Sequence, residues 1–259
     1  MLILVINLDR SIGRLTFMRR QIERLGLSFE RVPAIDGLNV PTDLARYFSH
    51  IARSTTPIID DAAVGCYASH LKAYQRIVAL NAPYALILED DALLPDDLTD
   101  IVCDTLYALP QGWDLVQLAT PHRHAIKPLS TLPCGGTLIR YSRVPHGAVG
   151  YLIRRSGAEK LLSPAIRRQW AIDTDTRRPW LFGLDVYGVT PNPIRHGSFP
   201  TTMGRVRKSA RRGLPRPTRL TWTNQPLRTL RGFAFNLRKL GVTWWARCFL
   251  VNCAAKLGV

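Results

Sequence analysis

Acidic residues are missing from the last part of this 259-residue chain. All 19 Asp and Glu side chains lie at or before Asp185, whereas 14 of the 35 Lys and Arg side chains follow it. The net charge of +16 therefore comes largely from the C-terminal segment, and residues 1–185 are close to neutral. A basic tail of this kind indicates an anionic partner, either a membrane surface or a nucleic acid.

Paired cysteines and long apolar runs are also missing. The five cysteines are odd in number and form no Cys-x-x-Cys pair, which argues against a disulfide framework and indicates a reducing compartment. No stretch reaches 18 apolar residues without charge, so no spanning helix is expected. The first residues, MLILVINLDRS, lack a basic lead and a small-residue cleavage site, and predict a β-strand rather than a signal peptide.

Apolar runs of strand length alternate with segments of helical periodicity. The predicted strands are 2–7, 27–32, 82–88, 113–118, 137–141 and 147–153, and the predicted helices are 13–25, 65–80, 96–109 and 155–162. This order predicts an α/β sheet with helices packed on its faces. We expect a catalytic domain over residues 1–204 and a basic extension over residues 205–259.

The extension has two parts. Residues 205–219 are basic and interrupted by proline, which is typical of a linker. Residues 227–250 combine apolar and aromatic side chains at helical spacing with several arginines, and predict one amphipathic basic helix. Such a helix either binds an anionic membrane surface or packs its apolar face on the catalytic domain.

An apolar strand delivers three adjacent carboxylates, Glu89, Asp90 and Asp91, to its carboxyl end. Ligands of open α/β sheets bind at that edge. Because adjacent anions repel one another, a hard divalent cation such as Mg²⁺ or Mn²⁺ fits the pattern and leaves positions open for a diphosphate. The alternative interpretation is a solvated acidic turn.

Two other segments carry polar side chains next to predicted strands. Ser69 and His70 stand on an otherwise apolar helix before the acidic strand, and Arg10 and Arg14 follow the first strand. Arginine at such a position suits a phosphate group. The alternatives are a hydrogen-bonded core histidine and ordinary surface arginines.

These segments together resemble a known family. VINLDRSIGR, AIDG, GCYASHLKAYQRIV, ALILEDDALL, GAVGYLIRRSGAEKLL and GLDVYG occur in this order. They are similar to glycosyltransferase family 25, the lipooligosaccharide-biosynthesis galactosyltransferase type. The resemblance covers roughly residues 2–204, and the spacing of GCYASH and LEDDALL is its most specific part. It implies a GT-A-type, Rossmann-like α/β/α sandwich.

The resemblance also implies an activity. A UDP-sugar, most often UDP-galactose, would donate its sugar with inversion to a saccharide acceptor of the lipopolysaccharide core, assisted by Mn²⁺ or Mg²⁺. The enzyme would lie on the cytoplasmic face of a bacterial inner membrane, and no nucleic-acid partner is expected. Competing interpretations are a non-catalytic binding relative, a nucleic-acid-binding protein and a different metal-dependent phosphotransferase.

Site roles follow from the same resemblance. Asp91 would hold the metal, with Glu89 near the metal or the ribose. The family's first motif maps onto Asn7, Arg10 and Arg14, which would line the nucleotide pocket with Asp90, and Asp36 would lie near the uracil. Ser69 and His70 match the family's Ser-His pair. Asp185 would be the catalytic base, with Asp173 and Asp175, beside Trp170 and Trp180, as rivals. His196 stands where the family tends to have Gln and is an alternative metal ligand.

Overall fold

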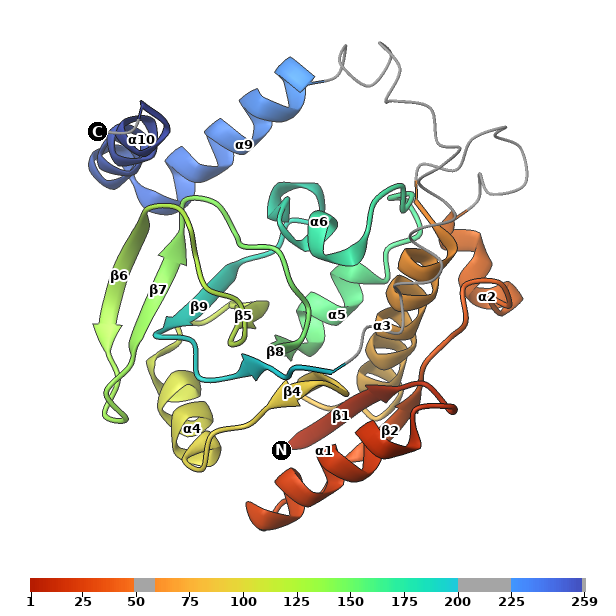
Figure 1. Ribbon diagram of the computed structural model, residues 1–259. Helices are drawn as coiled ribbons and strands as arrows, with labels where there is room; N and C mark the ends of the chain where they lie inside the picture. The colour runs from red at the N-terminus through yellow and green to blue at the C-terminus, as the bar shows by residue number, and fades with distance from the viewer. Residues whose placement is uncertain (49–58, 200–224, 258–259) are drawn as a thin grey trace.

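An eight-stranded mixed sheet forms the centre of the protein (Figure 1). The computed structural model describes residues 1–48, 59–199 and 225–257. The strand order is β2 (Glu30–Pro33), β1 (Leu2–Asn7), β3 (Tyr84–Glu89), β8 (Gly150–Arg154), β5 (Leu115–Gln117), β9 (Val186–Thr190), β7 (Thr137–Tyr141) and β6 (Ile126–Thr131). Strand β8 is antiparallel to both β3 and β5, so β1, β2, β3, β5 and β9 all run in the same direction.

Helices cover both faces of this sheet. Helices α1 (Ile12–Arg24) and α4 (Leu98–Ala108) pack on one face, and α3 (Asp61–Ala79), α5 (Arg155–Leu161) and α6 (Ile172–Thr176) pack on the other. Strand β3 is buried on both faces of the sheet. Its Leu86 and Leu88 side chains pack in the core beneath α1 and α4, whereas Ala85 and Ile87 pack in the core beneath α3, α5 and α6. The expected α/β/α sandwich is confirmed.

Helix α3 approaches a loop that lines the site. Asp60 caps the helix, since its carboxylate accepts a hydrogen bond of 2.8 Å from the Ala63 amide, and the helix therefore begins before the predicted residue 65. A Cβ atom on Gly65 would lie 2.5 Å from the Ile35 carbonyl oxygen and 2.6 Å from the Gly37 amide nitrogen. Glycine at this helix position lets the loop at residues 35–37 pack directly on α3.

The prediction missed several short elements. Strands β6 and β9 were not predicted. Neither were α6 and the 3-10 turn η2 (Pro179–Leu181), nor α2 (Thr42–Ala45) and the 3-10 turn η1 (Arg46–Phe48), which precede α3. Strand β10 (Arg195–His196) pairs with β4 (Ala92–Leu93) and brings a late segment beside the acidic triplet.

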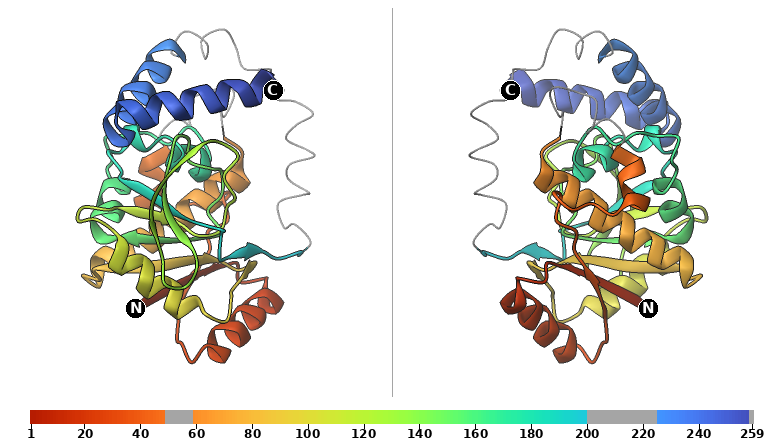
Figure 2. Two further views of the ribbon diagram at one scale, coloured as in Figure 1. Left: turned by 90° about the vertical axis from the view of Figure 1, so that its left-hand side faces the viewer. Right: turned by 90° about the vertical axis from the view of Figure 1, so that its right-hand side faces the viewer.

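The C-terminal extension forms two helices, so the prediction of a single helix is wrong. Helix α9 (Gln225–Leu240) ends where Gly241 adopts a φ of +79°, and α10 (Val242–Leu257) follows. Both lie at one end of the molecule, far from α1 (Figure 2). None of the described helices is long and apolar enough to cross a membrane. The predicted boundary at residue 204 lies outside the described residues.

Side chains from both helices join the extension to the domain. On α9, the Asn236 amide donates to the Ser142 carbonyl at 2.7 Å, and Phe235 packs beside Trp180. On α10, the Asn252 side chain accepts a hydrogen bond of 2.8 Å from the Ala125 amide. The extension was expected either to bind a membrane surface or to pack on the domain, and part of its surface does pack on the domain.

Candidate functional site

Asp90 is held by groups from β1 and α1. Because β1 pairs in parallel with β3, Ile6 lies opposite Glu89, and the next residues of the two strands come together at the carboxyl edge. There the Asn7 amide donates to Asp90 at 2.8 Å, and the Arg14 guanidinium donates to its other oxygen at 2.8 Å. Asn7 is buried and lies behind the cavity wall, so it positions Asp90.

Asp91 carries charge that its neighbours compensate only in part. Its Oδ2 atom lies 3.4 Å from His196 Nε2 and 3.6 Å from the Arg14 guanidinium. Its Oδ1 atom is buried and makes no hydrogen bond within the described part of the chain. Burial and the charge of Glu89 raise the pKa of Asp91, against the opposing effects of His196 and Arg14. A bound cation would reduce the repulsion between Asp91 and Glu89 and would give the Asp91 Oδ1 atom a partner, so these residues fit a divalent metal.

Glu89 faces a different set of partners. The buried His70 ring places Nε2 3.3 Å from Glu89 Oε1, and its Nδ1 lies 2.8 Å from the Tyr151 hydroxyl. The Tyr151 hydroxyl in turn lies 2.7 Å from that of Tyr74. This chain of contacts fixes the orientation of the imidazole and therefore of the carboxylate. His70 is thus both a core residue and part of the cavity wall.

Ser69 and Arg10 shape the rest of the pocket. The Ser69 hydroxyl accepts a hydrogen bond of 2.8 Å from the Ile35 amide and donates to the Gly65 carbonyl at 2.7 Å. Ser69 therefore holds the loop in which Asp36 lies. Asp36 is half-exposed and forms an ion pair of 3.4 Å with Arg10 across the mouth of the pocket.

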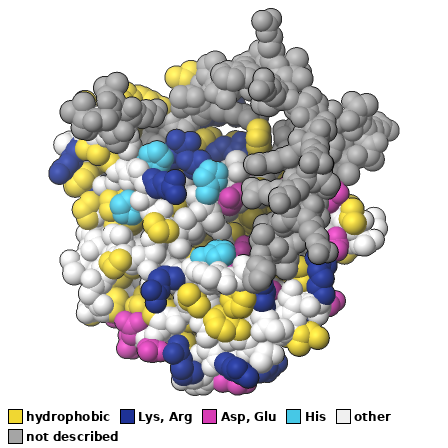
Figure 3. Space-filling model, viewed as in Figure 1, with side chains coloured by type: hydrophobic (Ala, Val, Ile, Leu, Met, Phe, Trp, Pro, Cys, Tyr) yellow, Lys and Arg dark blue, Asp and Glu magenta, His cyan; other side chains and the backbone are white. Residues whose placement is uncertain are grey.

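These groups surround one cavity of about 330 Å³ at the carboxyl edge of β1 and β3. Most of the predicted site residues line it, namely Arg10, Arg14, Asp36, Ser69, His70, Glu89, Asp90 and Asp91. Cys66, His196 and Phe199 also contribute to its wall. Histidine side chains lie together with Lys and Arg side chains on the face of the molecule seen in Figure 3.

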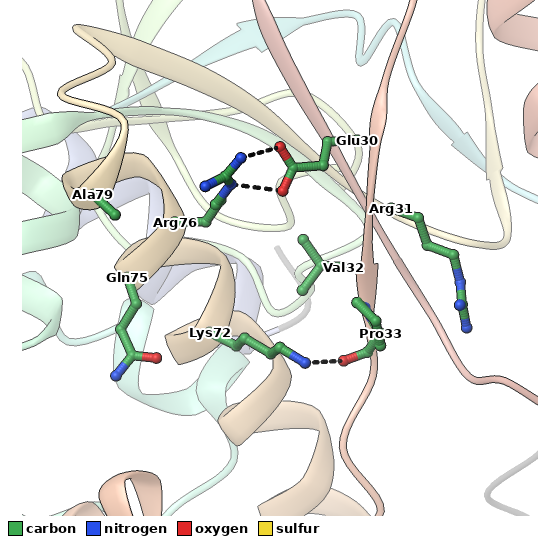
Figure 4. A pocket seen from close by; sticks show the side chains of 8 residues that line it. All are labelled: Glu30, Arg31, Val32, Pro33, Lys72, Gln75, Arg76 and Ala79. Carbon is green, nitrogen blue, oxygen red and sulfur yellow. Dashed lines mark hydrogen bonds and ion pairs between the residues drawn. The ribbon is translucent and has the colours of Figure 1, made fainter.

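A second hollow, of about 280 Å³, lies between β2 and α3 (Figure 4). Two of its basic side chains already have partners, because Arg76 forms a bidentate ion pair with Glu30 and Lys72 donates a hydrogen bond to the Pro33 carbonyl. No residue of the acidic triplet lines it. The chemistry therefore points to the first cavity.

The structure does not bring Asp185 to this cavity. Asp185 directly precedes β9, and its carbonyl accepts hydrogen bonds from the Asp114 and Leu115 amides at the start of β5. Since β5 and β9 run parallel to β3, Asp185 lies at the amino edge of these strands, whereas the triplet lies at the carboxyl edge. Its carboxylate binds Arg140 at 2.6 Å and Lys239 of α9 at 3.1 Å. The prediction that Asp185 is the catalytic base is therefore corrected.

The two rival carboxylates differ in accessibility. Asp175 is buried, contacts Arg178 and the Tyr67 hydroxyl, and has a pKa that burial raises to about 6. Asp173 is more exposed and lies 3.3 Å from the His146 imidazole. Its charge also contributes to raising the pKa of Cys66, a residue of the cavity wall. Asp173 is thus the more accessible of the two rivals, and neither of them lines the cavity.

The two tryptophans are engaged within the protein. Trp180 packs against α9, where Phe235 lies 6.3 Å away between ring centroids. The Arg178 guanidinium lies 5.3 Å from the centroid of Trp170. These contacts are typical of aromatic side chains that pack within the protein.

Three residues of the cavity wall, His196, Phe199 and Cys66, were not among the main predicted site residues. His196 was only an alternative ligand, because nothing local signals the β4–β10 pairing that brings it to Asp91. Phe199 lies 5.2 Å from the Arg14 guanidinium and depends on the same pairing. Cys66 had a detectable signal, since it precedes His70 by four residues on one helix and therefore shares its face.

The Asp185 contacts predict a pH-dependent stability. Asp185→Asn should lower the free energy of unfolding by about 1–3 kcal/mol near neutral pH, because Arg140 and Lys239 lose their counter-charge. Burial alone would raise the pKa of Asp185, but the two cations outweigh it and hold that pKa below its usual range. The stabilisation is therefore present above the unfolded-state pKa and is lost as the pH falls through the folded-state pKa.

Denaturant unfolding of both forms across this acidic range measures the effect. The difference in stability should close in acid, and a difference independent of pH would contradict the ion-pair explanation. Asp96→Asn, which removes an exposed pair with Arg24, is the control and should change stability by less than about 0.5 kcal/mol.

Comparisons with known proteins identify the family of this chain. The model of "Glycosyltransferase family 25 (LPS biosynthesis protein)" matches residues 1–176. A "Glycosyltransferase 25 family member" of Aedes aegypti is 28% identical over 171 residues, which cover 62% of this chain and 27% of the relative. The human "Inactive glycosyltransferase 25 family member 3" is 25% identical over 184 residues, covering 66% of this chain and 30% of the relative. The chain thus spans less than a third of the length of these curated relatives.

Two solved structures show a weak likeness. A glycosyltransferase involved in glycosylation of the major capsid of PBCV-1 has a TM-score of 0.42 and 8% identity, covering 82% of this chain and 98% of its own. The galactosyltransferase LgtC has a TM-score of 0.41 and 13% identity, covering 84% and 98%. These TM-scores support no inference. The family model, however, covers more than half of the chain and includes the acidic triplet. The chain belongs to glycosyltransferase family 25.

Proposed function

We propose that the cavity binds a UDP-sugar and that the protein transfers its hexosyl group, galactose in particular, to a saccharide acceptor with inversion. The observation that carries this proposal is the pairing of Asp91 with His196 at the cavity wall, with one Asp91 oxygen buried and without a hydrogen-bond partner among the described residues. The cavity volume of about 330 Å³ lies within the range of small-ligand sites.

Asp91 and His196 would hold Mn²⁺ or Mg²⁺, with Glu89 on the neighbouring side of the cavity. The metal would neutralise charge on the diphosphate as it leaves. Asp90 is already compensated by Asn7 and Arg14, so its role is to fix the geometry of the triplet. The Arg14 guanidinium, held beside both aspartates, can in addition contact a phosphate oxygen.

The acceptor hydroxyl needs a base on the side opposite the leaving diphosphate. Asp173 suits this role better than the other two candidates, because it is partly exposed, whereas Asp175 is buried and Asp185 is paired with two cations at the other sheet edge. The adjacent His146 imidazole orients its carboxylate. In this proposal Asp173 accepts the hydroxyl proton of the acceptor as the new glycosidic bond forms.

The C-terminal helices suit a lipid-linked acceptor, such as a lipopolysaccharide core, at the cytoplasmic surface of a bacterial inner membrane. Leu230, Phe233, Val242, Phe249, Leu250 and Val251 are exposed on α9 and α10. Arg231, Arg238 and Arg247 are exposed beside them, and the last 74 residues hold no acid. Each basic residue near an anionic surface contributes about 1 kcal/mol of attraction. A membrane therefore fits this surface better than a nucleic acid does, because exposed apolar side chains do not favour contact with a nucleic acid.

A non-catalytic relative is the competing function, since one human relative is named inactive. Such a protein would bind a nucleotide sugar without releasing UDP. The contact between Asp91 and His196 in the cavity wall favours the catalytic alternative. Binding alone does not require a metal to neutralise the charge of a departing diphosphate.

Asp91→Asn tests the metal site. Release of UDP from a panel of UDP-sugars in the presence of Mn²⁺ should fall by about 100-fold or more, because several kcal/mol of charge stabilisation is lost. Asp185→Asn is the matched carboxylate control and should retain turnover within about twofold, as it lies at the other sheet edge. Equal UDP release by wild type and Asp91→Asn, or by wild type with and without a chelator, would contradict the proposed role of the metal.

Asp173→Asn tests the base. Transfer to a saccharide acceptor should fall by about 100-fold or more, within the range of general-base catalysis, while binding of UDP to the protein stays unchanged. Calorimetric titration with UDP and a transfer assay separate these two effects. Full transfer by Asp173→Asn would move the base to another residue.

Leu250→Asp tests the membrane surface. Flotation with vesicles of anionic phospholipid should show binding that weakens about tenfold in the variant, since burying one leucine contributes about 1.5–3 kcal/mol. Tyr107→Asp, which changes a still more exposed residue on α4, should bind as wild type does. Unchanged flotation of Leu250→Asp would show that the helices are not the anchor.

A further inference from the structure

A second cluster of metal-ligand atoms lies in the cavity wall beside the acidic triplet. Cys66 and His70 occur four residues apart on α3 and share one helix face, and Glu89 ends the facing strand β3. The thiol sulfur, an imidazole nitrogen and a Glu89 oxygen lie within 4.8 Å of one another. Nothing in the proposed transfer reaction uses the Cys66 thiol.

We propose that Cys66, His70 and Glu89 form a binding site for a borderline or soft divalent cation of the Zn²⁺ type, separate from the oxygen-rich site at Asp91. The donor set of one sulfur, one imidazole nitrogen and one carboxylate oxygen is typical of Zn²⁺ and Co²⁺, whereas Mg²⁺ and Mn²⁺ prefer sites without sulfur in which oxygen predominates. Three protein ligands leave a fourth position that faces the cavity.

The spacing of the ligand atoms suits a tetrahedral ion. Ligands bound to Zn²⁺ at their usual lengths lie roughly 3.3–3.8 Å from one another in a tetrahedron. His70 Nε2 and Glu89 Oε1 already lie 3.3 Å apart, which matches an edge of that tetrahedron. A small movement of the Cys66 side chain, from within 4.8 Å, completes the third position.

The surroundings are also those of a metal-bound histidine. The second ring nitrogen of His70 contacts the Tyr151 hydroxyl at 2.8 Å, and the two rings stack with centroids 5.8 Å apart. An outer partner of this kind fixes the tautomer and directs the other nitrogen to the ion. The charges that, after burial, raise the pKa of Cys66 come from Glu89, Asp173 and Asp91, so the field at the thiol is negative and attracts a cation.

Co²⁺ is a spectroscopic probe for this site. Titration of the full chain with Co²⁺ should produce a near-ultraviolet thiolate-to-cobalt absorption, which Zn²⁺ abolishes and Mg²⁺ leaves intact. Cys66→Ala should remove this band, and Glu89→Gln should weaken Co²⁺ binding about 100-fold, the upper end of what the loss of an outer-shell partner costs. Thermal unfolding of each variant without metal checks that it folds.

Two control variants keep the outcome distinct from that of the transfer reaction. Cys103→Ala removes an exposed thiol on α4 and should keep the band. Asp91→Asn should also keep it, even though it abolishes UDP release. A titration without a thiolate band, or a band that survives in folded Cys66→Ala, would overturn the proposal whatever the transferase assays show.

Discussion

Asp90 and its two partners hold the cavity wall together. The Asn7 amide comes from the end of β1 and the Arg14 guanidinium from the first turn of α1, and both bind the middle carboxylate of the triplet at 2.8 Å. With Asp90 fixed from behind, Glu89 contacts His70 and Asp91 contacts His196 in the wall of the same cavity. The proposed hard-cation site therefore lies near His196, and the cluster of sulfur, nitrogen and oxygen ligand atoms lies beside α3.

The antiparallel strand β8 lies between β3 and β5 but does not change which edge of the sheet carries the cavity. Because β8 pairs with both β3 and β5, the strands on either side keep a common direction. The carboxyl edge therefore carries the cavity, and the amino edge carries Asp185 with its two cations. Lys239 belongs to α9, so the ion pair at the amino edge also joins the C-terminal extension to the domain. The carboxylates of the cavity and the ion-paired Asp185 are thus separated by the length of the strands.

One helix supplies much of the remaining wall. Gly65 admits the loop at residues 35–37, Ser69 holds that loop by hydrogen bonds, and Cys66 and His70 face the cavity between them. These four residues lie within two turns of α3, so a compact sequence segment determines the pocket shape, its polarity and the second cluster of ligand atoms. The buried Tyr74 and Tyr151 hydroxyls behind His70 make this part of the wall rigid.

The sequence by itself determined the alternation of strands and helices, the carboxyl-edge position of Glu89, Asp90 and Asp91, and the family, because apolar periodicity and contiguous motifs are local signals. Only the tertiary structure decided how distant segments meet. The two-residue pairing of β4 with β10 brings His196 to Asp91, and strand direction sends Asp185 to the opposite edge. Gly241 divides the C-terminal extension into two helices, which pack partly on the domain. The positions of His196 and Asp185 depend on long-range strand pairing and not on the residues nearest in sequence, so no local pattern could predict them, whereas Gly241 is a local helix-ending signal that the prediction overlooked.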